Sequence, residues 1–159
     1  MNGKASILIG SESDRHIMES SRPYYEYFDI EMDLRVMSAH RNPNEVSRFA
    51  SSARDNGYHA LIGAAGMAAH LAGALKAHST LPVIGVPLPG GIEDGMDALL
   101  STVQMPSGIP VGTLAIGKAG AINAALLSAS ILATKDKKIL MKIKSYRNSF
   151  ERVIPKRPY

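Results

Sequence analysis

Three side chains that can do chemistry together lie in the stretch Ser38-Ala39-His40-Arg41-Asn42-Pro43. Ser38 offers a hydroxyl, His40 an imidazole and Arg41 a guanidinium. An imidazole gives and takes protons near neutral pH, and a guanidinium binds phosphate or carboxylate through paired hydrogen bonds. A single histidine in a turn more often makes a structural hydrogen bond than it catalyses. The functional interpretation therefore depends on which other side chains the fold brings to this turn.

The residues around this stretch predict a strand before it and a helix after it. Alternating apolar residues over 32–37 indicate the strand. Asn42 suits the N-cap of the helix, Pro43 suits its first position, and Glu45 completes the spacing of a capping box. We expect this helix to end near Asn56-Gly57. His40 and Arg41 then lie at the carboxyl end of a strand beside a helix N-terminus, where open α/β sheets bind ligands and anions are favoured.

The rest of the chain alternates between strands and helices, which predicts a doubly wound parallel sheet of the α/β class. Further strands are expected at 5–9, 60–64, 82–86 and 111–116, and further helices at 14–28, from about 70, at 96–103 and at 119–133. Pro23 should kink or split the first helix, because proline removes a backbone donor. A long loop is expected at 87–95. The 159 residues fit one domain, with a core at about 5–133 and a helical tail at about 135–159.

Polar or small residues occupy three turns, each at the carboxyl end of a predicted strand. The first turn holds Ser11, Ser13 and Asp14, the second holds Ser38, His40 and Arg41, and the third holds Ala68, Ala69 and His70. Adjacent parallel strands would bring these turns together. The first supplies hydroxyls for a phosphate and a carboxylate for a ribose diol, although Ser13 is equally suited to capping a helix. The third lets a flat ring or a carboxylate approach the backbone. Together the turns predict a phosphorylated small molecule as ligand, with acid/base chemistry acting on it.

Two nucleotide motifs and a metal site are missing from the sequence. Gly112 and Gly117-Lys118 have the spacing of a P-loop, but the residues between them are apolar and Ala119 replaces the Mg-binding Ser or Thr. The turn from Gly63 to Gly66 lacks the third glycine of a dinucleotide fingerprint. The five histidines, at 16, 40, 59, 70 and 78, include no pair at i, i+4. We therefore expect neither ATP chemistry nor a metal ion.

The composition limits which cellular compartment and which kinds of partner we expect for this protein. Cysteine is absent, no stretch reaches the length of a membrane span, and the first residues do not resemble a signal peptide. These features favour a soluble, cytoplasmic protein without a membrane partner. Much of the net charge of +4 comes from the tail between Lys135 and Lys156. Without interleaved aromatic residues this charge is weak support for nucleic acid as a partner.

The tail carries one apolar stripe, formed at helical spacing by Ile139, Ile143, Tyr146 and Phe150. Such a stripe has to be buried against something. The chain's own domain and a neighbouring subunit would bury it equally well, so both interpretations stay open.

Five motifs, in order, resemble the N5-carboxyaminoimidazole ribonucleotide mutase family of purine biosynthesis. They are Gly10-Ser11-Glu12-Ser13-Asp14, Ser38-Ala39-His40-Arg41, Ala68-Ala69-His70-Leu71, Val103-Gln104-Met105-Pro106 and Gly108-Ile109-Pro110-Val111-Gly112-Thr113-Leu114-Ala115-Ile116. The resemblance runs from about Ala5 to Ala133. It implies a three-layer α/β/α flavodoxin-like fold, a ribonucleotide substrate, a reaction without a cofactor, and a homo-octamer whose sites lie between subunits.

Carried over by position, the resemblance makes His40 the acid/base residue. It implies that the substrate contacts come from Ser11, Ser13, Asp14, Ser38, Ala39, Arg41, Ala68, Ala69, His70 and Leu71. For His70, a structural hydrogen bond at a helix start is as good an interpretation as a direct role. The implied reaction moves a carboxyl group within the substrate, from N5 to C4 of the aminoimidazole.

Some residues depart from the family pattern. Met67 and Ala72 stand where the family usually has Gly and Pro, Pro23 interrupts a helix, and the loop 89–94 is unlike the common one. We expect these differences to affect loop closure and rate more than fold or substrate. Arg41 after His40 resembles the mutase branch, because the branch that carboxylates aminoimidazole ribonucleotide directly with carbon dioxide typically has Lys there. That direct carboxylation and a non-catalytic flavin- or nucleotide-binding module on the same fold are the alternatives.

Overall fold

The computed structural model describes residues 3–153, with side chains as far as Ser149. Its sheet consists of β1 (Gly3–Ile9), β2 (Ile30–Val36), β3 (Ala60–Ala65), β4 (Val83–Pro87) and β5 (Gly112–Thr113). All neighbouring strands are parallel, in the order β2-β1-β3-β4-β5. This is the strand order of flavodoxin-like folds.

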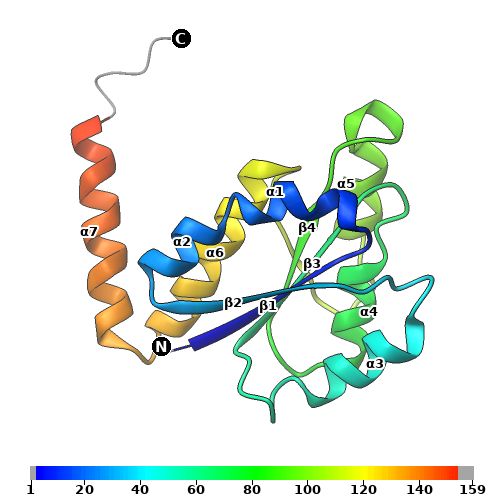
Figure 1. The fold of residues 1–159 in the computed structure, drawn as a ribbon, viewed down its shortest axis with the longest axis horizontal. Helices are drawn as coiled ribbons and strands as arrows, with labels where there is room; N and C mark the ends of the chain where they lie inside the picture. The colour runs from blue at the N-terminus through cyan, green and yellow to red at the C-terminus, as the bar shows by residue number, and fades with distance from the viewer. Residues whose placement is uncertain (1–2, 154–159) are drawn as a thin grey trace.

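Helices cover both faces of the sheet. They are α1 (Arg15–Glu19), α2 (Arg22–Tyr27), α3 (Pro43–Ser52), α4 (Leu71–His78), α5 (Met96–Val103), α6 (Lys118–Ala133) and α7 (Lys137–Val153), with short 3-10 turns η1 (Glu12–Asp14) and η2 (Ile92–Asp94). One face carries α1, α2 and α6, and the other carries α3, α4 and α5 (Figure 1). The predicted three-layer α/β/α architecture is therefore confirmed.

The two-residue period of β1 divides its side chains between these two layers. Ile7 and Ile9 belong to the apolar cluster under α1, α2 and α6, and Leu8 belongs to the cluster under α3 and α4. All three side chains are completely buried. A strand buried on both faces reads as a continuous apolar run, which is why the sequence predicted it well.

Pro23 splits the first predicted helix in two, as expected. The segment α1 ends at Glu19, and α2 starts at Arg22 with Pro23 in its first turn. The first backbone donors of a helix have no partner within it, so proline is tolerated there at little cost.

One expectation about secondary structure was wrong. The strand predicted at 111–116 is paired only at Gly112 and Thr113, opposite Ile84 and Gly85. The Leu114 N–H still donates to Gly85 O at 2.9 Å, and the chain then leaves the sheet. Leu114 still packs against the apolar cluster beneath α6, and such burial does not require strand pairing. The predicted loop at 87–95 is a loop that contains the short 3-10 turn η2.

The helix α4 lies unusually close to the sheet. A Cβ atom added at Gly63 would lie 2.6 Å from Ala72 Cα, and one added at Gly85 would lie 2.4 Å from Thr102 Cγ2 of α5. Only glycine permits these approaches. The strand glycines thus set the distance of α4 and α5 from the sheet, and with it the position of His70 at the start of α4.

The tail helix α7 packs on its own domain through three of the four predicted stripe residues. Ile139 is buried, and Ile143 and Tyr146 pack against the cluster beneath α2 and α6. The Lys142 ammonium also donates to Asp29 Oδ2 at 2.7 Å, just beyond α2. The Phe150 side chain lies outside the described residues. Among residues 3–153, no helix combines the length and apolar composition that crossing a membrane requires.

Candidate active site

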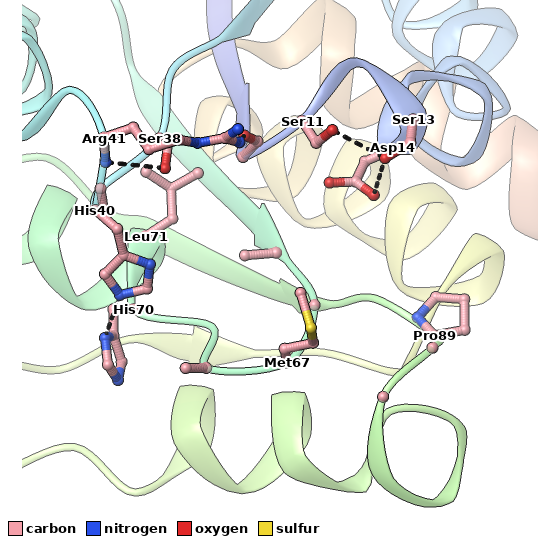
Figure 2. A pocket seen from close by; sticks show the side chains of 17 residues that line it. Ser11, Ser13, Asp14, Ser38, His40, Arg41, Met67, His70, Leu71 and Pro89 are labelled. Atoms are coloured by element: carbon pink, nitrogen blue, oxygen red, sulfur yellow. Dashed lines mark hydrogen bonds between the residues drawn. The ribbon is translucent and has the colours of Figure 1, made fainter.

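A cavity of about 590 Å³ lies where β1, β2, β3 and β4 end (Figure 2). Its walls come from the three predicted turns and from the loop after β4. The lining residues are Gly10, Ser11, Ser13, Asp14, Ser38, Ala39, His40, Arg41, Ala65, Gly66, Met67, Ala68, His70, Leu71, Pro89, Gly90 and Gly91. Parallel strands present their carboxyl ends at one edge, so a cavity here follows from the topology.

Hydrogen bonds between side chains and backbone close the turn that carries His40 and Arg41. Ser38 Oγ accepts the Arg41 N–H at 3.2 Å, and Asn42 Oδ1 accepts the Ser38 N–H at 3.3 Å. The predicted capping bond from the Asn42 side chain to α3 is therefore absent, although Asn42 occupies the N-cap position. The Asn42 amide instead fixes the turn, which holds Ser38 buried and leaves His40 and Arg41 exposed.

Arg41 bridges two strand ends. One of its terminal guanidinium nitrogens donates to the carbonyl of Gly10, after β1, at 2.6 Å. A guanidinium has five N–H donors, so this bond leaves others available to an anion. Arg41 therefore places a fixed positive charge between the first and second turns of the cavity.

Hydroxyls and a carboxylate meet in the first turn. Ser13 Oγ lies 3.0 Å from Ser11 Oγ and 3.4 Å from Asp14 Oδ1 (Figure 2). No side-chain capping bond is made at the start of η1 or of α1. The Ser13 hydroxyl thus faces its polar neighbours at the cavity, and the capping alternative is not what the structure shows.

His40 and His70 meet across the cavity wall. His40 Nε2 lies 2.7 Å from His70 Nδ1, with the ring planes at 78° (Figure 2). A hydrogen bond between two imidazole nitrogens needs one proton, with the other nitrogen as acceptor. Protonating both nitrogens would break it. His70 sits at the N-cap of α4 without capping it, so its side chain contacts His40 rather than the helix.

The third turn and the residue after it place four small or apolar side chains at different depths. Met67 has a left-handed backbone, with φ of 51°, and its side chain is 65% exposed. Ala68 lines the cavity, as does the buried Leu71. Ala69 does not: it is only 2% exposed, and its N–H donates to Ser101 Oγ at 3.0 Å. Ala69 therefore lies behind the wall that its neighbours form.

Sequence reasoning missed several residues that line the cavity. They are Gly10, Ala65, Gly66, Met67, Pro89, Gly90 and Gly91. The Pro89-Gly90-Gly91 segment was expected only as the middle of a loop. It reaches the cavity because β4 pairs with β3, which places Pro87 beside Ala65. No local signal in the sequence gives that register.

The sequence profile of the family described as AIR carboxylase matches residues 4–152. The chain belongs to this family. The N5-carboxyaminoimidazole ribonucleotide mutase of Escherichia coli K12 is 47% identical over 146 residues, which cover 92% of this chain and 86% of the relative. The enzyme of the same name from Brucella melitensis is 44% identical over 158 residues, 99% of this chain and 98% of the relative. The resemblance recognised from the motifs is confirmed.

The fold of this AIR carboxylase family member agrees with a solved structure. The crystal structure of Treponema denticola PurE superposes with a TM-score of 0.86 at 30% sequence identity, covering 96% of this chain and 94% of that one. Within residues 3–153 no group of three or more His, Asp or Glu side chains is placed to hold a metal ion.

Proposed function

We propose that this chain converts N5-carboxyaminoimidazole ribonucleotide into 4-carboxy-5-aminoimidazole ribonucleotide in purine biosynthesis, as an N5-carboxyaminoimidazole ribonucleotide mutase. Its curated relatives of that name match almost its whole length. The observation that carries the proposal for the site is the convergence of the motif residues. All of the predicted site residues except Ala69 line one cavity, around a histidine pair.

The cavity divides the substrate contacts by charge. Arg41 and the hydroxyls of Ser11 and Ser13 face the region where a phosphate would be neutralised and hydrogen-bonded. Asp14, beside them, suits the ribose hydroxyls, because a carboxylate accepts two such bonds. The aminoimidazole ring then lies toward Ala39 and Ala68, whose small side chains allow close approach to the backbone.

His40 carries the proton in this proposal. As an acid it protonates the carbamate nitrogen while the N5–C bond breaks and carbon dioxide leaves, which produces aminoimidazole ribonucleotide. Ring carbon C4 attacks the trapped carbon dioxide, and the neutral His40 then removes the C4 proton. One proton is given and one is taken back, so the enzyme returns to its starting state. The hydrogen bond to His70 orients the imidazole for both steps.

We further propose that the enzyme works in the cytoplasm as a homo-octamer, with each chain forming a single domain. The ribonucleotide is its small-molecule partner. The support for the assembly is the family resemblance, together with the apolar side chains that the isolated chain leaves exposed on α5.

Isotope retention tests the reaction. Freshly generated, unlabelled N5-carboxyaminoimidazole ribonucleotide is converted in a single turnover in labelled bicarbonate and EDTA, with carbonic anhydrase present to equilibrate the carbon dioxide. We expect the 4-carboxy product to contain little label. Label at the proportion present in the medium would assign the chain to direct carboxylation by free carbon dioxide. Absence of product would reject both reactions.

A further inference from the structure

Ser101, in the last turn of α5, is hydrogen-bonded to the third turn on the side away from the cavity. Its Oγ accepts the Ala69 N–H at 3.0 Å and lies 2.7 Å from the Asp97 carbonyl and 3.2 Å from the Met67 carbonyl. A serine hydroxyl has one proton to donate, and the shortest of these contacts is the bond to Asp97, one turn back in the helix. An oxygen lone pair is then free to accept from Ala69.

Ala69 depends on this acceptor. The residue is 2% exposed, so its N–H is withdrawn from water. A buried backbone donor without a partner is rare in folded proteins, because the group keeps its full desolvation cost. Removing the Ser101 hydroxyl should therefore displace the turn until the Ala69 N–H finds another acceptor or reaches water.

A displacement of Ala69 would move residues that line the cavity. The residues on either side of it, Ala68 and His70, both line the cavity, and the His70 N–H donates to Ala68 O at 2.9 Å. His70 in turn contacts His40 at 2.7 Å, so moving this turn changes the histidine pair (Figure 2). Ser101 itself does not line the cavity.

The same helix also fixes the neighbouring part of the cavity wall, the loop after β4. Asp97, four residues before Ser101, accepts the Ile92 N–H through Oδ2 at 3.1 Å. The neighbouring Gly91 packs so closely that a Cβ atom there would lie 2.4 Å from the same carboxylate oxygen. One turn of α5 thus sets the spacing between the third turn and the loop that contains Pro89.

We propose that Ser101 is a positioning residue of the active site, whose hydroxyl holds the third turn so that His70 stays in contact with His40. This inference rests on the proposed function for its effect on turnover. Its structural part, the attachment of the turn to α5, can be measured without any activity.

The test compares Ser101→Ala with Ser101→Thr, which keeps the hydroxyl, and with Ser130→Ala as a matched control. Ser130 also bonds to the carbonyl four residues earlier, Leu126 O at 2.9 Å, but it lies on α6 away from the cavity. We expect Ser101→Ala to lower kcat by about 10- to 100-fold, the range for a misplaced catalytic group, with KM within about threefold. Ser101→Thr and Ser130→Ala should stay within about threefold of the parent in kcat.

A double-mutant cycle with His70→Ala asks whether the effect passes through the turn. If it does, Ser101→Ala adds less than about threefold to the loss already caused by His70→Ala. Full additivity, a threonine variant as slow as the alanine variant, or an equal loss in Ser130→Ala would each overturn the inference.

Amide hydrogen exchange separates this inference from the proposed function. Ser101→Ala should speed exchange in the peptide that contains Ala69, and Ser130→Ala should not. Unchanged exchange in Ser101→Ala would overturn the inference whatever the activity. Faster exchange in an enzyme that does not act on the ribonucleotide would reject the proposed function alone. If Ser101→Ala does not fold, Ser101→Cys replaces it, with a weaker acceptor and a smaller expected loss.

Discussion

The contact between His40 and His70 joins two turns that are 30 residues apart in the sequence. His40 comes after β2 and His70 after β3, and these strands lie on either side of β1. Among the side chains described, up to Ser149, no carboxylate contacts either histidine, and the hydrogen bond between the two rings is the one that orients them.

Replacing His40 with Asn should remove turnover and leave binding largely intact. The amide cannot exchange protons near neutral pH, while Arg41 and Asp14 keep their places in the cavity. We expect a loss of ~100- to 10,000-fold in single-turnover rate, with product affinity within about threefold of the parent. His78→Asn, at the exposed end of α4, is the control. A His40 variant within a few-fold of the parent rate would remove this residue from the mechanism.

His59 ties β1 to the segment before β3 and makes stability depend on pH. The ring nitrogen Nδ1 of His59 accepts the backbone N–H of Lys4 at 3.0 Å, and the backbone N–H of His59 donates to Lys4 O. Burial lowers the pKa of His59 from its ordinary value of 6.5 to about 4, because the charged imidazolium would lose its hydration there. The folded chain therefore binds fewer protons than the unfolded chain between these two values.

Stability should fall as the pH drops from about 6.5 to about 4, and the contribution of His59 should be fully present above that window. Thermal unfolding measured across this range checks the prediction. His59→Asn can keep an acceptor for Lys4 but cannot titrate, so its unfolding temperature should change less with pH than that of the parent. A parallel pH profile in the parent and His59→Asn, with His78→Asn as control, would contradict the prediction.

For individual residues, the sequence predicted which residues belong to the site better than it predicted where their side chains lie. Types and spacing singled out Ser11, His40 and Arg41, because each stands in a turn at a strand end. Ala69 was grouped with its neighbours, yet it faces α5, since adjacent residues of a turn point in different directions. Ser101 gave no signal, because its partner lies 32 residues away and only the packing of α5 against β4 brings them together.

Elements are positioned in this fold by small residues where helices meet the sheet. Gly63 in β3 faces Ala72 in α4, and α4 begins at the residue after His70. The close approach is possible because the glycine lies on the strand and Ala72 carries only a methyl group.

Gly63→Ala should both destabilise the protein and lower its kcat. The added methyl group would lie 2.6 Å from Ala72 Cα and 2.7 Å from Ala72 N, so α4 has to move and carry His70 with it. Overpacking of this kind costs about 1–3 kcal/mol. Chemical denaturation and kcat provide the two measurements.

Gly112→Ala is the matched control for Gly63→Ala. It is also a strand glycine, but its added Cβ would meet only Val83 O, at 3.7 Å. We expect it to unfold and turn over much like the parent. Equal behaviour of the two variants would show that the contact between β3 and α4 does not set the position of His70.

The boundaries of some helices could be predicted from the sequence. The helix α5 lies where the sequence places it, at Met96–Val103, and Pro23 splits the first helix. The end of β5 was not predictable, because an apolar run records burial and not backbone pairing. The capping interaction of Asn42 failed for a related reason: its side chain had a second donor within reach, the Ser38 N–H.

The whole molecule leaves an apolar row exposed along α5. Met96, Leu100 and Val103 follow one another at helical spacing, and their side chains are 39%, 57% and 49% exposed. Ile92, just before this helix, is 69% exposed. Contiguous exposed apolar side chains of this size usually mark an interface. In a homo-oligomer the same row is repeated on every chain, so copies can cover one another around a symmetry axis.

The proposed homo-octamer predicts a mass near eight chains in light scattering at micromolar concentration. Leu100→Asp should reduce that mass, because a carboxylate in an apolar interface loses its hydration without gaining a partner. Ala77→Asp places the same charge on the exposed surface of α4 and should leave the mass unchanged. The row faces solvent in the single chain, so the folded subunit of Leu100→Asp should keep its circular dichroism spectrum. A parent that runs as a monomer would contradict the octamer. An octamer that survives Leu100→Asp would place the contacts between subunits on another surface than the α5 row.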